Sequence, residues 1–556
     1  MYDILIEPWL HVVDMDGNLK SIGLLDCLIN AHNYKKICEH KDFPILRRLQ
    51  QRLIETFIVD IFNIDDDTKV KDLFEEKQFS KDKIIDYFET CKNSGISFDL
   101  FDENHPFLQA DKEAYKKIMK SKKSSSVASI NPKISSGNNK LFFTPPSIND
   151  YIGIAGAKDT RTSYYDDIYD KHVPSENTTK VTFEDYLNLV LMRHCISGWG
   201  GSGYKPSLQC LSSKMPIFYQ VEQCGKNESL FNSIIFNLGI CNVVDLGKPL
   251  WRWDSYEYGM DLIRQYQYEI PYLTGMFFPT MCIYPDFTSI DYESKTISKV
   301  YKLGLPFDKR YDNLLVKARE NWIRNSEPSV AVDYGKDKHE TIPVCFHSAR
   351  QAWMDIQTYL NIEDNTLKSL QATKKILSND FEEDIELTAY YLTMDKSKYL
   401  VHGSYQCVVP FYITNNDQLF YAVKEYMANV QAQLRLLSDN IKKINKALYY
   451  IDYASRKDKN AKPILSVEKN IKNQFLAYCE SLFTNYLLED LRCIYVKYSK
   501  CDSMDENNKM VEEIKSSIPV KYQNLIRQKR FELLSRIPIP FGKALELKKQ
   551  LKNITK

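Results

Sequence analysis

The stretch M-A-N-V-Q-A-Q-L-R-L-L-S-D-N-I-K-K-I-N-K-A-L-Y-Y-I, residues 427–451, has apolar residues at alternating steps of three and four. These residues are Met427, Val430, Leu434, Leu437, Ile441, Ile444, Leu448 and Ile451. Heptad spacing of this kind places one continuous apolar seam along an α-helix. The pattern therefore predicts a single long helix that packs against other helices through this seam.

Three further helical segments are predicted after this one. Apolar spacing marks residues 471–486 and, behind Pro519, residues 522–534, while a short helix over 541–551 follows an I-P-I-P break. Four helices close together in sequence are typical of a bundle. We therefore predict a C-terminal four-helix bundle over residues 416–556.

The chain before residue 416 has a different pattern. An apolar run near the N-terminus leads into D-M-D-G-N, which predicts a strand and a tight turn with Gly17 at positive φ. Residues 43–92 carry helical spacing, and short β-like runs alternate with turns between about 180 and 415. The predicted fold class is α+β: a mixed α/β N-terminal globular domain, residues 1–415, followed by the helical bundle.

The composition limits the class of protein. Hydrophobic residues make up 44% and charged residues 26% of the 556 residues, which is typical of a globular protein. A net charge of +1 gives no global attraction to nucleic acid or to anionic membrane, so any polyanion site must be local. Unclustered cysteines, an acidic start and the lack of a long apolar run favour a cytoplasmic protein without a membrane segment.

A glycine-rich loop, S-G-W-G-G-S-G-Y-K over residues 197–205, holds four of the nineteen glycines. Three of them, Gly198, Gly200 and Gly203, fit the G-x-G-x-x-G spacing of dinucleotide sites. Such a site needs a strand before the loop and a helix after it, but residues 186–193 look helical and Pro206 follows closely. A nucleotide-dependent enzyme built on this loop is therefore the alternative interpretation.

Motifs for catalysis are missing from the sequence. There is no G-x-S-x-G, no H-E-x-x-H and no Walker lysine motif, and the nine histidines form no close pair. We therefore expect a non-catalytic protein that needs no cofactor. His105 and His194 are expected to be structural.

A basic stretch runs from Lys116 to Ile148 with seven lysines and no acidic residue. One interpretation is a mobile surface loop that only keeps the protein soluble. The other is an arm that contacts phosphates, which its length favours, because structureless loops beyond about 15 residues are often functional.

The order of the short motifs resembles the CasA family, the large subunit of the type I-E CRISPR surveillance complex, Cascade. The motifs are D-I-L-I-E-P-W-L at the N-terminus, E-N-H-P-F-L-Q at 103–109, K-L-F-F at 140–143, the glycine loop, S-A-R-Q-A-W at 348–353, and the terminal helices. H-P-F-L-Q and the glycine loop are the most specific of these.

The resemblance implies a site for target DNA. Family members use the glycine loop to contact the minor groove of the protospacer-adjacent duplex, where bare main chain fits a groove about 6 Å wide. The implied contacts are Gly198, Gly200, Gly201, Gly203 and Lys299, with Lys295 and Lys302 as neighbours. A hairpin within residues 394–398 would part the first base pair as a wedge formed by Asp395, Lys396, Ser397 and Lys398.

The resemblance also implies contacts to RNA and to other proteins. Phe143 matches an aromatic residue that anchors the loop holding the 5′ handle of the guide RNA. Phosphate contacts are expected from Lys122, Lys123, Lys133, Lys140, Lys205, Lys317 and Arg319. The implied partners are the guide RNA, double-stranded target DNA, the small subunits, the handle-end subunit and a helicase-nuclease.

Two expectations complete the sequence-based view. Some relatives hold zinc through a cysteine cluster, but only Cys282 stands at the matching place, so no metal is predicted. The expected function is recognition of the short flanking motif and the start of duplex opening, while base pairing with the guide reads the sequence. A helical scaffold that binds only protein is the remaining interpretation.

Overall fold

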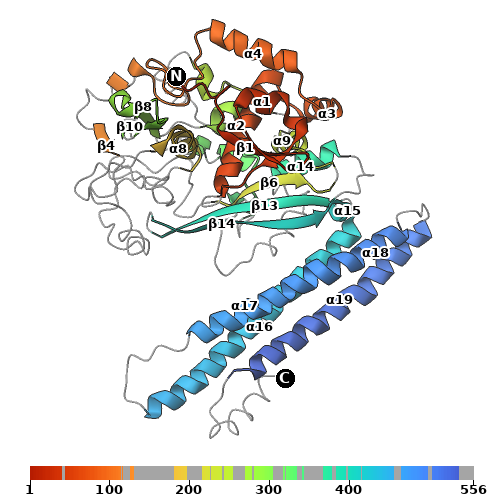
Figure 1. The fold of residues 1–556 in the computed structure, drawn as a ribbon. Coiled ribbons are helices and arrows are strands. Elements are labelled where there is room, and N and C mark those ends of the chain that lie inside the picture. The colour runs from red at the N-terminus through yellow and green to blue at the C-terminus, as the bar shows by residue number, and fades with distance from the viewer. Residues whose placement is uncertain are drawn as a thin grey trace. The chain divides into compact units, whose positions relative to one another are not determined.

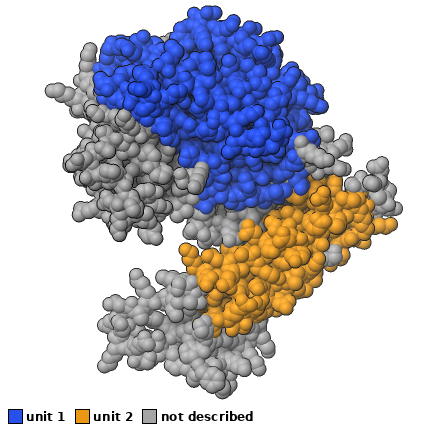
Figure 2. Space-filling model, viewed as in Figure 1, with its two compact units in different colours: residues 1–348, 362–409 blue, residues 349–361, 410–556 orange. Residues whose placement is uncertain are grey.

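The computed structural model divides the chain into two compact units (Figures 1 and 2). Unit 1 comprises residues 1–348 and 362–409, and unit 2 comprises residues 349–361 and 410–556. The structure describes residues 1–40, 44–113, 115–116, 125–129, 181–196, 216–225, 227–240, 243, 245–253, 270–277, 281–297, 299–304, 317–319, 321–334, 341–343, 367–377, 384–395, 398–414, 416–455, 465–498 and 504–537.

Unit 1 begins with a small antiparallel sheet in the order β2-β1-β3. Its strands are β1 (Leu10–Asp14), β2 (Leu19–Ile22) and β3 (Tyr34–Ile37). The turn between β1 and β2 is stabilised by the Asp14 carboxylate, which accepts the backbone N–H groups of Asp16 and Asn18 at 2.9 Å each. Gly17 has a φ of +88°, which confirms the predicted turn.

Helices follow where the sequence predicts them. They are α1 (Leu24–Ile29), α2 (Ile45–Phe62), α3 (Asp67–Glu75) and α4 (Lys81–Asn93). The side chains of Asp66 and Ser80 cap α3 and α4 by accepting N–H groups from the first turns. The helical prediction for residues 43–92 is therefore confirmed.

The helix α2 lies at the centre of unit 1 and is buried on every side over residues 45–59. Three of its arginines form buried ion pairs. Arg48 binds both oxygens of Glu55 at 2.8 Å, Arg52 binds both oxygens of Glu327 at 2.5 and 2.8 Å, and Arg47 binds Glu222. Burial tends to raise the pKa of Glu327, but Arg52 and Arg319 outweigh it, and the pKa is lowered.

A second sheet in the order β14-β13-β6 packs against α2 and α9. Its strands are β6 (Phe218–Gln223), β13 (Asp384–Asp395) and β14 (Lys398–Pro410), and α9 spans Leu230–Asn237. β13 pairs with β6 from Ile385 opposite Gln223 to Tyr390 opposite Phe218. The rest of β13 and its partner β14 therefore extend beyond β6 as a two-stranded ribbon (Figure 1).

Three smaller groups of strands complete unit 1. β4 (Ser125–Ser129), β10 (Lys299–Gly304) and β7 (Met281–Pro285) form one sheet; β5 (Val181–Thr182), β9 (Thr296–Ile297) and β8 (Ile290–Asp291) form another; β11 (Val332–Tyr334) pairs with β12 (Thr341–Pro343). The remaining described helices of at least five residues are α8 (Phe183–Ile196), α11 (Tyr272–Met276) and α14 (Lys368–Ile376).

Unit 2 is mainly helical over its described residues. It contains α15 (Phe411–Thr414), α16 (Asp417–Ser455), α17 (Leu465–Leu482), a π-helical turn (Phe483–Leu487), α18 (Leu488–Tyr498) and α19 (Met504–Ser535). The predicted long helix is confirmed as α16, and its seam residues Val430, Leu437 and Ile441 are buried. No helix among the described residues is both long enough and apolar enough to cross a membrane.

One helix boundary in unit 2 was predicted wrongly. The sequence predicts a helix that starts behind Pro519, but α19 begins at Met504 and continues through that proline. Proline inside a helix removes one backbone hydrogen bond, and this loss is offset by the apolar face of α19, where Ile514, Tyr522 and Ile526 are buried. The predicted fourth helix, residues 541–551, lies outside the described residues, so the four-helix bundle stays a prediction.

Candidate nucleic-acid interface

The helix α8 leads directly into the glycine loop. It spans Phe183–Ile196, which confirms the helix predicted over residues 186–193. Gly198, Gly200, Gly201, Gly203 and Lys205 follow it and lie outside the described residues. A dinucleotide site requires a strand at this place, so the local fold argues against the Rossmann interpretation of these glycines.

The beginning of α8 is fixed to the N-terminal sheet and to the segment before β9. Nε2 of His11 on β1 lies 2.9 Å from Oε1 of Glu184, and the backbone N–H of Phe183 donates to the carbonyl of Lys295 at 2.9 Å. The hydrogen bond with Glu184 raises the pKa of His11, although partial burial opposes this. These contacts tie the first turn of α8 to two separate parts of unit 1.

The rest of α8 is held by the H-P-F-L-Q segment. The Tyr186 hydroxyl donates to Oε1 of Gln109 at 2.5 Å, and Nε2 of the buried His194 donates to the carbonyl of Leu108 at 2.6 Å. Leu108 has a φ of +56°, a left-handed conformation that is uncommon for a leucine. The structural role predicted for His194 is thus confirmed, and the motif positions the helix that carries the glycine loop.

The strand β10 carries Lys299 and Lys302 between β4 and β7. Lys299 is its first residue and lies opposite Ser129 of β4, and Lys302 lies opposite Ser126. β4 belongs to the basic stretch of residues 116–148, so the interpretation of that stretch as a structureless loop is wrong for residues 125–129. Of the other basic-arm candidates, Lys122, Lys123, Lys133 and Lys140 lie outside the described residues, as does Phe143.

The two ends of α8 lead to different candidate segments. Lys295 bonds to the first residue of the helix, and Lys299 follows four residues later, after β9 has paired with β5. The glycine loop starts at the other end of this 14-residue helix, which is roughly 20 Å long. Lys295 is also engaged, since its Nζ lies 2.7 Å from Oε2 of Glu7.

A hairpin occurs where the wedge is predicted. Asp395 is the last residue of β13 and Lys398 is the first of β14, while Lys396 and Ser397 between them lie outside the described residues. Tyr390 is the last residue of β13 that pairs with β6, so residues 391–395 of β13 lie beyond that pairing. The wedge role of these residues stays a prediction.

The two remaining phosphate candidates differ in exposure. Lys317 is exposed, and its phosphate contact stays a prediction. Arg319 is only 3% exposed, its Nη1 donates to the carbonyl of Gly275 at 2.5 Å, and its guanidinium lies 4.3 Å from the ring centroid of Trp322. The prediction that Arg319 contacts phosphate is therefore wrong, because the core of unit 1 already uses this side chain.

The family comparison gives one match. Residues 3–157 match the family model of CRISPR-associated protein Cse1. This range includes the H-P-F-L-Q segment and K-L-F-F. No protein with a curated description matches the sequence.

The fold is similar to several solved structures. CasA from Thermus thermophilus is 14% identical with a TM-score of 0.60, and the match covers 96% of this chain and 100% of that chain. Cse1 from Acidimicrobium ferrooxidans is 15% identical with a TM-score of 0.55, over 96% and 98% of the two chains. A chain of a CRISPR RNA-guided surveillance complex is 13% identical with a TM-score of 0.59, over 95% and 99%. These matches confirm the resemblance to the CasA family that the motifs indicate.

Proposed function

We propose that this chain, which resembles CasA over almost its whole length, is the large subunit of a type I-E CRISPR surveillance complex. In this role it would read the protospacer-adjacent motif through the minor groove and start the opening of target DNA. The observation that carries the proposal is the similarity of the fold over 96% of this chain and 100% of a CasA chain, combined with the Cse1 match of residues 3–157.

The contacts that fix α8, the helix before the glycine loop, support the proposal. A loop that reads a duplex must be held on a rigid support, because a small displacement loses the contact. The support here is α8, which Glu184 ties to β1 and which Tyr186 and His194 tie to the H-P-F-L-Q segment. Glycines without side chains would let the main chain approach the edges of the bases.

The wedge role is supported by the shape of the β13-β14 ribbon. A wedge must resist the force of the stacked bases that it separates. The base of the ribbon pairs with β6, and β6 is joined to the central helix through the buried pair of Glu222 with Arg47. The ribbon is thus anchored at its base, and the segment that joins Asp395 to Lys398 is the part that would enter the duplex.

Phosphate contacts would come from lysines that surround β10. Lys299 and Lys302 lie on this strand, and the strand beside it belongs to the basic stretch with Lys122 and Lys123 just before it. The net charge of +1 means that this local cluster, and not the whole molecule, would attract the duplex. Binding should therefore weaken steeply with added salt, because counterions are released from the neutralised phosphates.

The remaining roles follow from the resemblance and are part of the proposal. Phe143 would contact the loop that holds the 5′ handle of the guide RNA. The helical unit 2 would contact the small subunits, and the assembled surface would recruit a helicase-nuclease. The chain itself would catalyse no reaction and would work in the cytoplasm.

A duplex-binding experiment tests the proposal. The chain is assembled with its neighbouring gene products and a guide RNA, and the affinity for target duplexes with every flanking triplet is measured. We expect affinity to depend on the triplet by at least about tenfold, since a poor fit at a base pair costs roughly 1–3 kcal/mol. Gly201→Asp should remove most of this dependence, because it adds a carboxylate beside the phosphates.

The control is Gln78→Asp, which adds the same charge at an exposed turn before α4 and should leave affinity unchanged. Equal affinity for all triplets would defeat the proposed motif recognition. If Gly201→Asp assembled normally and bound like the wild type, the glycine loop would not be the reader. A saturable thermal shift with NAD, FAD or ATP that Gly201→Asp abolishes would instead favour the nucleotide-dependent enzyme.

A further inference from the structure

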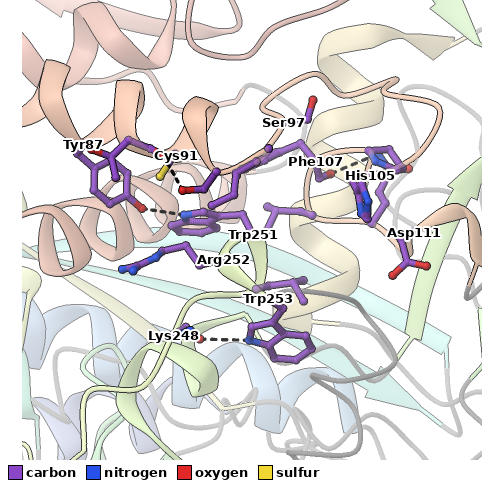
Figure 3. Close-up of a pocket in the computed structure, with 18 residues that line it drawn as sticks. Tyr87, Cys91, Ser97, His105, Phe107, Asp111, Lys248, Trp251, Arg252 and Trp253 are labelled. Atoms are coloured by element: carbon purple, nitrogen blue, oxygen red, sulfur yellow. Dashed lines mark hydrogen bonds between the residues drawn. The ribbon is translucent and has the colours of Figure 1, made fainter.

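A cavity of about 570 Å³ lies in unit 1 (Figure 3). Three segments form its walls. They are the end of α4, the segment that contains H-P-F-L-Q, and the P-L-W-R-W run at residues 249–253. Two of the chain's six tryptophans come from the last of these runs. Its volume lies in the range of roughly 300–1,000 Å³ that is typical of small-ligand sites.

The base of the cavity is rigid. Trp251 is 7% exposed, and its ring stacks on Phe57 with the centroids 4.1 Å apart and the planes 19° from parallel. Its Nε1 donates to the Tyr87 hydroxyl at 3.0 Å, and this hydroxyl donates to Oδ2 of Asp60 at 2.5 Å. A chain of bonds from a core helix to the lining therefore fixes the position of the indole.

The accessible charge of the cavity is positive. Lys248 is exposed and forms no ion pair with the described residues. Nη1 of Arg252 lies 2.7 Å from Oδ1 of Asp60, and 38% of the Arg252 side chain is exposed. The Asp60 carboxylate is buried behind the lining and is already used by Tyr87 and Arg252, and the acid in the lining, Asp111, is only 5% exposed. An anionic ligand is thus favoured.

Trp253 supplies an aromatic surface beside these cations. It is half-buried and lines the cavity, and its Nε1 donates to the carbonyl of Lys248 at 3.4 Å (Figure 3). This bond holds the indole next to the lysine. Ser97 and His105, on the opposite wall, offer a hydroxyl and an imidazole that could bond to the polar edge of a planar ligand.

We propose that this cavity binds one unpaired nucleotide of a single-stranded nucleic acid. The base stacks on Trp253 and the phosphate lies between Lys248 and Arg252. Stacking on an aromatic ring together with a cation for the phosphate is the usual way in which single strands are held without sequence preference. An acidic peptide is a weaker fit, because the lining consists of a helix end and turns and offers no strand edge for main-chain pairing.

The cavity is also lined by the H-P-F-L-Q segment, which holds α8 in place. Leu108 and Gln109 belong to its wall, and their backbone and side-chain oxygens bond to His194 and Tyr186 of α8. A nucleotide in the cavity would thus contact the segment that positions α8. The binding site itself does not rest on the proposed function, since it needs neither guide RNA nor partner subunits.

The test measures binding of labelled single strands to the full-length chain. The probes are an RNA and a DNA strand of about six nucleotides, followed by fluorescence polarisation, with an unlabelled nucleoside monophosphate as competitor. Trp253→Leu should weaken binding by about 5- to 100-fold, which is the range of one base stack. Lys248→Glu should weaken it by at least about fivefold, and Trp253→Phe should stay within about threefold of the wild type.

The matched control is Lys81→Glu, which makes the same charge change at the exposed beginning of α4, outside the cavity. It should bind like the wild type. If Trp253→Leu fails to fold, the binding of Lys248→Glu tests the proposal instead, because a change at the exposed Lys248 should not disturb folding. Wild-type affinity in Lys248→Glu would overturn the proposal. So would binding of a hexaglutamate peptide in place of the strands, since the site would then take an acidic peptide.

Discussion

Two long helices, α2 in unit 1 and α16 in unit 2, differ in whether their charged side chains are buried. α16 has 39 residues, and its apolar seam is buried while charged residues such as Arg435 and Lys442 face water. α2 has 18 residues, and over residues 45–59 its arginines are buried with its leucines. Apolar periodicity in a helix therefore predicts that the polar face is exposed to solvent only when the polar residues have no buried partners.

The partners of α2 explain the difference. Arg47 binds Glu222 on β6, and Arg52 binds Glu327, so charges on one helix join segments that are far apart in the sequence. Gln51 and Gln220 add a hydrogen bond at 2.6 Å between the same helix and β6. Buried ion pairs stabilise little in net terms, but losing one partner is costly because the other charge is left without compensation.

The largest effect should come from breaking such a pair in α2. Arg48→Met leaves the fully buried Glu55 carboxylate without its cation, and we expect unit 1 to lose about 3–5 kcal/mol of unfolding free energy. Urea unfolding followed by circular dichroism measures this loss. The double variant Arg48→Met with Glu55→Leu should recover more than half of it.

The matched change on α16 is Lys442→Met, where the lysine is exposed. It should shift the unfolding free energy by less than about 0.5 kcal/mol. A loss below about 1 kcal/mol for Arg48→Met would show that the α2 charges are not truly buried, and the contrast between the two helices would disappear.

A smaller effect is expected in the seam of α16. Leu437 is fully buried, whereas its neighbour Leu436 is 45% exposed. Leu437→Ala should therefore cost unit 2 about 2–4 kcal/mol of unfolding free energy, because it removes buried methyl groups and leaves a cavity. Leu436→Ala is the control within the same turn, and urea unfolding should show a cost below about 1 kcal/mol. Equal costs for the two variants would contradict the assigned seam.

The contrast also explains what the sequence could predict. Local features were predicted correctly, such as the helices α16 and α8 and the turn at Gly17. Each of them depends on the spacing of apolar residues along a short segment or on one special residue. The role of Arg319 was missed, because a sequence does not reveal that a cation will find Trp322 and the Gly275 carbonyl in the core. The strand β4 was missed because three serines with Val127 and Ala128 form no strand pattern of their own and pair only beside β10.

The candidate interface also has parts that could be predicted before the structure was known and parts that could not. The ends of β13 and β14 lie where the family resemblance implies a hairpin, so this part was expected from the resemblance and not from local spacing. The contact between Lys295 and Phe183 at the start of α8 joins segments that are far apart in the sequence, and it depends on which strand pairs with which. Pairing between distant segments has no local signal, so only the structure supplies it.

The smallest expected effect comes from the exposed pair of His11 and Glu184, which sharpens the contrast with the buried pairs of α2. Glu184 raises the pKa of His11 above 6.5, so the charged imidazole is stabilised in the folded state. The stabilisation is complete below about pH 6.5 and disappears as the pH rises through the higher pKa of the folded state. Because 49% and 30% of the two side chains are exposed, solvent screening limits it to a few tenths of a kcal/mol.

The measurement compares wild type and His11→Gln by urea unfolding at about pH 5.5 and about pH 8.5. Glutamine keeps a polar side chain without the titration, so the difference between the two proteins should be larger at the lower pH and should shrink in high salt. A difference that grew with pH would mean that neutral histidine is the favoured form at the start of α8. The exposed pair would then be governed by desolvation, unlike the buried pair of Arg52 and Glu327, in which the cations outweigh the effect of burial on the pKa of Glu327.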